Sequence, residues 1–282
     1  MKSLNQDLIY LYCLTDKIPS NARFISQKMR QGCCTTNKET EDLVDNVYFI
    51  FHLGLYAVVG KVSTDEFSEG NLKRNLAELE WIKIKVSIHE KVIETVMKNS
   101  CVIPFKFGTV FNTEDSLKTM LTQHAEVFKE NLKNLRGKEE WGVKIYCDMA
   151  KLKENLIQKD NELLNLDKDI KSSSAGKAFI LKKKKEELLN TIVNKNLNAY
   201  GQDSFERFKE HTVQSRINKL LPREVTERKD DMILNSVFLM KKNKVEDFIN
   251  TVEGLKIEYA DQGLFFDCTG PWPPYNFCSN GL

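Results

Sequence analysis

The chain has 282 residues, enough for one large or two medium-sized domains, and 41% of them are hydrophobic, which suffices for a core. Its 42 basic and 40 acidic residues leave a net charge of +2, so the composition does not indicate nucleic acid or a membrane surface as the main partner. No apolar run approaches the ~20 residues that span a bilayer. Seven cysteines without CxxC spacing are typical of reduced, cytoplasmic thiols.

The first half of the chain predicts strands, helix, strand and helix. Residues 8–14 are β-rich and no small-residue cleavage site follows them, so they predict a first strand and not a signal peptide. Residues 47–53 and 55–62 predict a hairpin around Gly54. Helical spacing of apolar residues then runs from residue 72 to about residue 99. Residues 101–111 predict either an edge strand or a strand with a break, because Pro104 lies inside the run. Residues 113–138 predict a capped helix.

The second half repeats this order with a long helical addition. Alternation in residues 140–147 predicts a strand, and a heptad-like pattern in residues 152–170 predicts a helix. A break at residues 172–176 and a second helical stretch from residue 177 to about 211 predict an antiparallel helical hairpin. Beyond it we expect a loop at 223–231, a strand at 232–240, a helix at 244–252 and strands at 255–259 and 264–270.

No pattern for catalysis or metal binding emerges. The pair His89-Glu90 lacks the second histidine of a zinc protease, because Ile93 stands four residues after His89. Packing or helix-surface roles therefore suit His89 better than metal ligation, although a triad assembled from distant residues stays open. The adjacent Cys33 and Cys34, in the polar stretch 26–45, lack the second pair that a zinc site needs.

Three motifs have two interpretations each. Residues 105–109 resemble a phosphate loop but contain one glycine only, which favours a strand with a turn at Gly108. The four lysines 182–185 fan around a helix and predict a solvated surface, or less readily an acidic partner. The terminal run from Gly270 to Phe277 holds three of the six prolines and predicts a stiff, extended aromatic segment. This segment either binds a partner or folds back onto its own domain, where Trp272 would clamp the last sheet to the helices or to the first domain.

Several of these stretches, in the same order, resemble the gas vesicle protein L/F family. They are the terminal TGPWPPYNF (269–277), VIPFKFGTVF (102–111) preceded by HEKVI (89–93), EWGVK (140–144) and GKAFIL (176–181). The resemblance covers nearly the whole chain from residue 8, except residues 26–45. The family pattern often has Arg where this chain has Lys106, so bidentate pairing would be lost at that position.

The resemblance implies an α+β fold of two ferredoxin-like domains, residues 1–137 and 138–282, the second elaborated by the helical hairpin. It implies a cytoplasmic, gas vesicle-associated accessory protein without catalytic activity or cofactor. Such a protein would act in vesicle assembly by binding the hydrophobic shell protein or other accessory proteins. The alternative is an enzyme or a small-ligand regulatory protein on the same scaffold. The candidate residues for partner binding or domain clamping are Pro104, Phe105, Lys106, Phe107, Gly108, Gly270, Pro271, Trp272, Pro273, Pro274, Tyr275 and Phe277.

Overall fold

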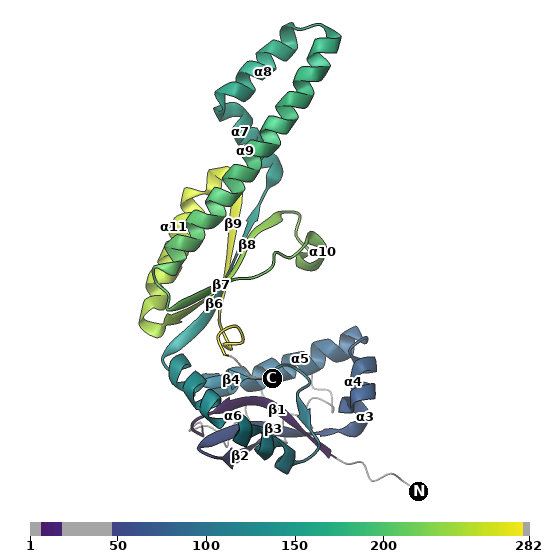
Figure 1. Cartoon of the computed structure of the whole chain (residues 1–282), viewed down its shortest axis with the longest axis vertical. Helices are drawn as coiled ribbons and strands as arrows, with labels where there is room; N and C mark the ends of the chain where they lie inside the picture. The colour runs from purple at the N-terminus through teal and green to yellow at the C-terminus, as the bar shows by residue number, and fades with distance from the viewer. Residues whose placement is uncertain (1–6, 19–46, 279–282) are drawn as a thin grey trace. The chain divides into compact units, whose positions relative to one another are not determined.

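A computed structural model describes residues 7–18 and 47–278 (Figure 1). The chain divides into two compact units, which we call unit one (Met1–Glu139 with Trp272–Leu282) and unit two (Glu140–Pro271). The sequence-based division, by contrast, assigns the whole terminal segment to the second domain. The polar stretch 26–45, with Cys33 and Cys34, lies outside the described residues.

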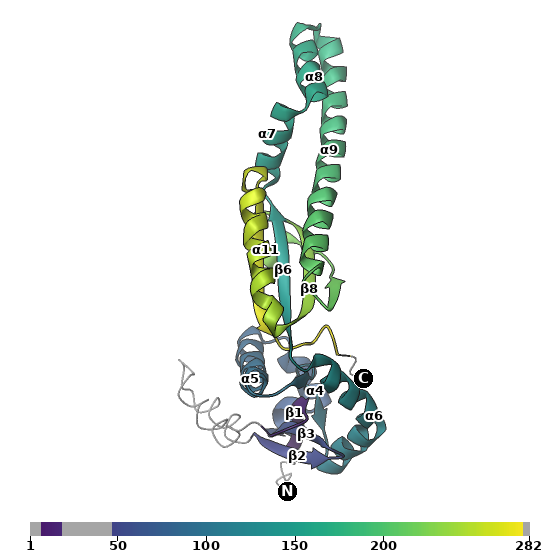
Figure 2. The ribbon, with the colours of Figure 1, turned by 90° about the vertical axis from the view of Figure 1, so that its left-hand side faces the viewer.

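Unit one contains an antiparallel sheet in the order β2-β3-β1-β4, and β5 also pairs with β1. Its elements are β1 (Asp7–Thr15), β2 (Tyr48–His52), β3 (Leu55–Ser63), α3 (Thr64–Phe67), α4 (Glu69–Asn75), α5 (Leu79–Met97), β4 (Val102–Pro104), β5 (Val110–Phe111) and α6 (Glu114–Leu135). Helices α5 and α6 lie on opposite faces of the sheet (Figure 2). Eight of the nine residues of β1 are therefore buried.

Local chemistry explains the elements of unit one that were predicted correctly. The β2–β3 hairpin closes through Leu53 and Gly54, whose φ angles of 50° and 82° suit a two-residue turn that requires positive φ at both positions. Helix α6 begins at a reciprocal capping box between Thr113 and Ser116. It is followed by Gly137 with φ 72°, the left-handed conformation that commonly ends helices.

The prediction of a strand with a break for residues 101–111 is confirmed. Two short strands, β4 and β5, pair with β1, and the residues between them form a turn stabilised by the Thr109 N–H and hydroxyl, which both donate to the Lys106 carbonyl. Gly108, with φ 82°, supplies the left-handed conformation within this turn. The turn follows Phe105 directly, so the interpretation of Gly108 as a turn residue is confirmed.

Unit two contains a sheet in the order β7-β8-β6-β9. Its elements are β6 (Lys138–Cys147), α7 (Met149–Lys159), α8 (Asn161–Ser172), α9 (Ala175–Lys209), β7 (Gln214–Ile217), α10 (Arg223–Thr226), β8 (Asp231–Lys241), η2 (Lys242–Lys244), α11 (Val245–Glu258), η3 (Ala260–Gln262) and β9 (Leu264–Trp272). Helices α9 and α11 cover the sheet through a core that includes Phe208, Phe238 and Phe248. The predicted α+β class is confirmed.

Helices α7, α8 and α9 form the predicted antiparallel hairpin, which extends beyond the sheet of unit two (Figures 1 and 2). Helix α9 has 35 residues, which corresponds to about 50 Å at the ordinary helical rise. We call the far end of the hairpin, residues 168–185, the hairpin tip; it comprises the end of α8, the turn and the start of α9.

Two expectations for unit two are wrong, and one strand was not predicted. Residues 255–258 form the end of α11 and not a strand, because Leu255 continues the helical stripe of Phe248 and Val252 into the core. The heptad-like helix is interrupted at Asp160, whose carboxylate accepts from the Leu163 N–H and caps α8. Strand β7 was not predicted, since only four residues form it and three of them are exposed.

Candidate functional site

The two sequence motifs singled out as candidates meet at one residue, His89 of α5. Pro104 and Phe105 lie against β1: Pro104 pairs with Cys13, and the Phe105 N–H donates to the Tyr12 carbonyl at 2.9 Å. Phe105 is buried, and its carbonyl lies 3.1 Å from His89 Nε2. The start of the first motif thus belongs to the core of unit one, because its backbone pairs with β1 and the Phe105 side chain is buried.

Phe107 and Gly108 make further contacts around His89: Phe107 packs on the imidazole, and Gly108 contacts its neighbour Tyr10. The rings of Phe107 and His89 lie edge to face with centroids 5.8 Å apart. The Gly108 N–H donates to the Tyr10 hydroxyl at 3.0 Å, and a Cβ at Gly108 would lie 3.1 Å from a methyl of Leu72. Gly108 therefore serves close packing as well as the turn, while Lys106 of the same motif is exposed.

The terminal segment is not a continuous stiff rod. Strand β9 continues to Trp272, and the chain then turns: the Tyr275 N–H donates to the Pro273 carbonyl at 2.7 Å, and the Phe277 N–H to the Pro274 carbonyl at 3.3 Å. Pro273, Pro274 and Phe277 are buried. The turn directs Tyr275 onto the core cluster of unit one.

Tyr275 joins His89 and its neighbour in a hydrogen-bond network. The Tyr275 hydroxyl lies 3.0 Å from His89 Nε2 and donates to Glu90 Oε1 at 2.9 Å. On the other side of the ring, His89 Nδ1 lies 2.9 Å from the Tyr10 hydroxyl. Because the Phe105 carbonyl can only accept, Nε2 carries the imidazole proton, and Nδ1 accepts from Tyr10. We call Tyr10, His89, Glu90 and Tyr275 the anchor network.

Burial sets the electrostatics of the anchor network. It lowers the pKa of His89 to about 4, although the hydrogen bond to the Phe105 carbonyl acts in the opposite direction. It raises the pKa of Glu90, which the hydrogen bond from Tyr275 partly offsets. Burial and then the nearby Glu90 carboxylate raise the pKa of the Tyr275 hydroxyl. The imidazole is therefore neutral at pH 7, as the direction of the Tyr10 hydrogen bond requires.

The arrangement joins the terminal segment to α5 of unit one through Tyr275. Each polar atom of His89 is occupied by a hydrogen-bond partner, and aromatic rings surround the imidazole. The sequence indicated a packing role for His89 but gave no sign of Tyr10, Glu90 or the link to Tyr275. Tyr275 is separated from His89 by 186 residues, so no local pattern could have revealed the contact.

The remaining residues of the terminal motif are not members of this network. Gly270 is in unit two with φ 149°, and a Cβ there would lie 2.8 Å from the Trp141 ring. Glycine is thus required by the close approach of a ring as well as by its φ. Pro271 is exposed, and the Trp272 side chain is 44% exposed.

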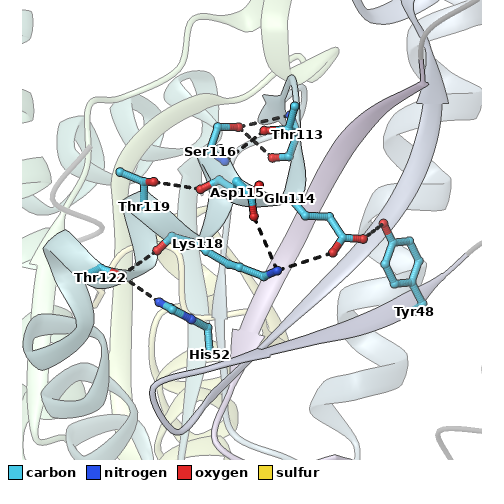
Figure 3. Close-up of polar contacts among 9 residues, drawn as sticks. All are labelled: Tyr48, His52, Thr113, Glu114, Asp115, Ser116, Lys118, Thr119 and Thr122. Carbon is cyan, nitrogen blue, oxygen red and sulfur yellow. Dashed lines mark hydrogen bonds and ion pairs between the residues drawn. The ribbon is translucent and has the colours of Figure 1, made fainter.

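The other histidines also have structural partners. His52 at the end of β2 lies 2.7 Å from the Thr122 hydroxyl of α6, and near the start of that helix the Tyr48 hydroxyl donates to Glu114 at 3.3 Å (Figure 3). Burial, followed by the Glu114 charge, raises the pKa of Tyr48 to about 12. These contacts fasten the edge strand β2 to α6.

Figure 3 also shows Lys118 between the two acidic residues of the first turn of α6, Glu114 and Asp115, at 3.9 and 3.8 Å.

In unit two, His211 lies 2.8 Å from the Thr251 hydroxyl. His124 packs its ring against Phe128. Within residues 7–18 and 47–278, no group of three or more His, Cys, Asp or Glu side chains is arranged to hold a metal ion. No helix in the same part of the chain is long and apolar enough to cross a membrane.

The lysine run at the hairpin tip separates into two kinds of residue. Lys185 faces α8 and pairs with Asp167 at 2.6 Å, where both side chains are partly buried. Lys182, Lys183 and Lys184 are exposed. One lysine therefore stabilises the hairpin, and the solvated-surface interpretation is confirmed for the other three.

Comparisons with known proteins cover both units. A family model described as gas vesicle synthesis protein GvpL/GvpF matches residues 8–279. Gas vesicle protein L1 of Halobacterium salinarum is 25% identical over 280 residues, covering 95% of this chain and 89% of that protein. Gas vesicle protein L of a Streptomyces species is 23% identical over 232 residues, 80% of each chain. The crystal structure of the gas vesicle protein GvpF from an Anabaena species superposes with a TM-score of 0.69 at 19% identity, covering 97% of this chain and 98% of that one.

Proposed function

This chain belongs to the gas vesicle synthesis protein family GvpL/GvpF, and from that premise we propose that it acts in gas vesicle assembly by binding other vesicle components. The observation that carries the proposal is the extent of the family match, which runs from β1 in unit one to the terminal segment. The match thus includes both sheets and the hairpin, so the role belongs to the whole chain.

The proposed partners are the hydrophobic shell protein and other accessory proteins, in the cytoplasm or at the vesicle surface. A shell subunit rich in apolar surface would need that surface covered before assembly, because exposed apolar patches drive aggregation. A binding factor without catalysis suits the anchor network, in which the hydrogen-bonding atoms of His89 are already engaged. No observation on the described residues favours the alternative of an enzyme or a small-ligand regulator.

We further propose that both units are ferredoxin-like. In unit one the strands follow β1, β2, β3, β4 along the chain and lie in the order β2-β3-β1-β4. In unit two the strands β6, β7, β8 and β9 lie in the corresponding order β7-β8-β6-β9. One such arrangement repeated in both halves supports the two-domain expectation, with the terminal segment returning to unit one as a clamp.

Within the candidate residues, we assign clamping to the buried and half-buried ones and partner contact to the exposed ones. Phe105, Phe107, Gly108, Tyr275 and Phe277 support the clamping role through the contacts described above. Pro104, Pro273 and Pro274 are buried and belong to the same group. Lys106, Pro271 and Trp272 are exposed and remain the candidates for contact with a partner.

The test is deletion of the gene in a cell that forms gas vesicles, scored by buoyancy and electron microscopy. We expect vesicles to be absent or deformed, a pull-down with the wild-type protein to recover the shell protein, and reintroduction of the wild-type chain to restore vesicles. Normal vesicles in the deletion strain would contradict the proposal.

Two variants separate clamping from partner contact in the same strain. Truncation after Thr269 would remove Tyr275 from the core of unit one, so loss of vesicles could reflect unfolding. Trp272→Ala alters an exposed side chain instead. If the Trp272→Ala protein is as stable as wild type and still restores vesicles, the terminal segment acts as a clamp only.

A further inference from the structure

The hairpin tip of unit two exposes two large apolar side chains on the outer face of α9. The Phe179 side chain is 72% exposed and Ile180 is 68% exposed. The helix packs its other face: Lys185 pairs with Asp167 of α8, Leu181 is half-buried one turn before it, and Val193 is buried further along. The exposure of Phe179 and Ile180 is therefore not the result of a helix end without packing, since the same turns of α9 already have a packed face.

The charge around this apolar pair is positive. Residues 168–187 contain seven lysines against one aspartate and two glutamates, Glu186 and Glu187, although the whole chain is nearly neutral. Lys183 and Lys184 stand four residues after Phe179 and Ile180, which places them on the same face of the helix, one turn further along. Within the described residues, no carboxylate pairs with Lys182, Lys183 or Lys184, whereas Lys185 is held by Asp167.

We propose that the hairpin tip is a docking surface for an acidic amphipathic helix of another component of the vesicle machinery. The inference rests on the proposed function for the identity of that machinery. An apolar pair followed by a turn of lysines is complementary to a helix whose apolar stripe is flanked by Glu or Asp. The apolar contact supplies affinity, and the lysines supply orientation and a faster encounter.

The position of the surface fits such a task. The tip lies at the end of the hairpin away from the sheet of unit two, where neither α11 nor the strands cover α9 (Figures 1 and 2). Helix α8 braces the tip on the inner side through Leu163 and Leu166, which are both buried. A partner helix can therefore lie along the outer face without displacing any packed side chain.

The test measures binding of the purified full-length protein to a synthetic helix of about 18 residues with Leu at helical spacing and Glu elsewhere, and to the same helix with Lys in place of Glu. We expect the acidic helix to bind and the basic one to bind at least tenfold more weakly. Raising the salt concentration weakens binding of the acidic helix, because exposed charges are screened.

Two sets of variants locate the binding. Phe179→Ser with Ile180→Ser weakens binding of the acidic helix roughly tenfold or more, and Ile257→Ser, which changes a side chain 80% exposed on α11, leaves it unchanged. Gln at Lys182, Lys183 and Lys184 weakens binding and flattens its salt dependence. The control with an equal change in net charge places Gln at Lys195, Lys219 and Lys229, which are exposed outside the tip.

The inference is overturned if the acidic helix binds no better than the basic one, or if the tip variants bind like wild type. It is also overturned if the protein binds anionic phospholipid liposomes and not the acidic helix, and if the tip variants lose that liposome binding. Each of these three results leaves the proposed function standing, since that function is tested separately by deletion of the gene.

Discussion

Replacement of Tyr275 by Phe removes one hydroxyl group and leaves the ring that packs on the core of unit one. The hydroxyl lies 3.0 Å from His89 Nε2 and donates to Glu90 at 2.9 Å. A hydrogen bond to a charged group contributes about 1.5–3 kcal/mol, but Glu90 is only half-buried and regains water when Tyr275 no longer donates. We therefore expect the free energy of unfolding of unit one to fall by about 1–2 kcal/mol.

For a domain of about 150 residues, that loss lowers the melting temperature by roughly 3–6 °C. Hydrogen exchange followed by mass spectrometry distinguishes the two units, which a single melting curve does not. Exchange should accelerate in peptides from β1 and α5, while peptides from α11 in unit two remain unchanged. Urea denaturation gives the matching change in free energy.

The matched control is Tyr56→Phe. Tyr56 pairs its ring with Phe51 at 4.9 Å between centroids, and within the described part of the chain its hydroxyl makes no hydrogen bond. Its loss should change stability by less than about 0.5 kcal/mol. Equal effects of the two substitutions, or an unaltered unit one in Tyr275→Phe, would refute the clamping role of the anchor network.

Further predictions concern pH and two glycines. Because His89 has a pKa of about 4 when folded and 6.5 as the ordinary value, its contribution to the stability of unit one is complete above pH 6.5. It is lost as the pH falls toward 4, by up to about 3 kcal/mol. The raised pKa of Glu90 acts in the opposite direction on stability, which it increases at low pH. The contribution of His89 is therefore measured as the difference in the free energy of unfolding between wild type and His89→Gln across pH 4–7. Equal slopes of that free energy against pH in the two proteins would be inconsistent with a buried neutral imidazole. Gly270→Ala brings a Cβ to 2.8 Å from the Trp141 ring at φ 149° and should lower the free energy of unfolding of unit two by about 1–3 kcal/mol. Gly254→Ala, inside α11 with no atom within 4 Å of the new Cβ, should instead raise the free energy of unfolding of unit two by about 0.5–1 kcal/mol. Urea denaturation measures both changes, and a stabilising Gly270→Ala with a destabilising Gly254→Ala would contradict the account of both glycines.

Sequence reasoning succeeded where a structure depends on neighbouring residues. The hairpin around Gly54, the start of α6 at Thr113 and the long helix α9 all follow from local patterns. It failed at residues 255–259, because a short apolar run suits a strand and a helix end equally well. The core contact of Leu255 with Phe248 and Val252 decided between them.

The candidate site shows the same limit at longer range. Both motifs were recognised as unusual, but their meeting at His89 depends on the chain returning from unit two to unit one at Trp272. Neither proline content nor aromatic spacing encodes that return. The resemblance to the gas vesicle family, which the family model confirms, identified the protein's setting without locating these contacts.

The account as a whole is tested most directly by photo-crosslinking during vesicle formation. A photoreactive phenylalanine analogue replaces Phe179 at the hairpin tip in one strain and Ile257, the exposed control on α11, in another. We predict that illumination links position 179 to a gas vesicle protein through an acidic helical segment, and that position 257 gives no such product. Crosslinks to gas vesicle proteins from neither position, or equally from both, would contradict the account.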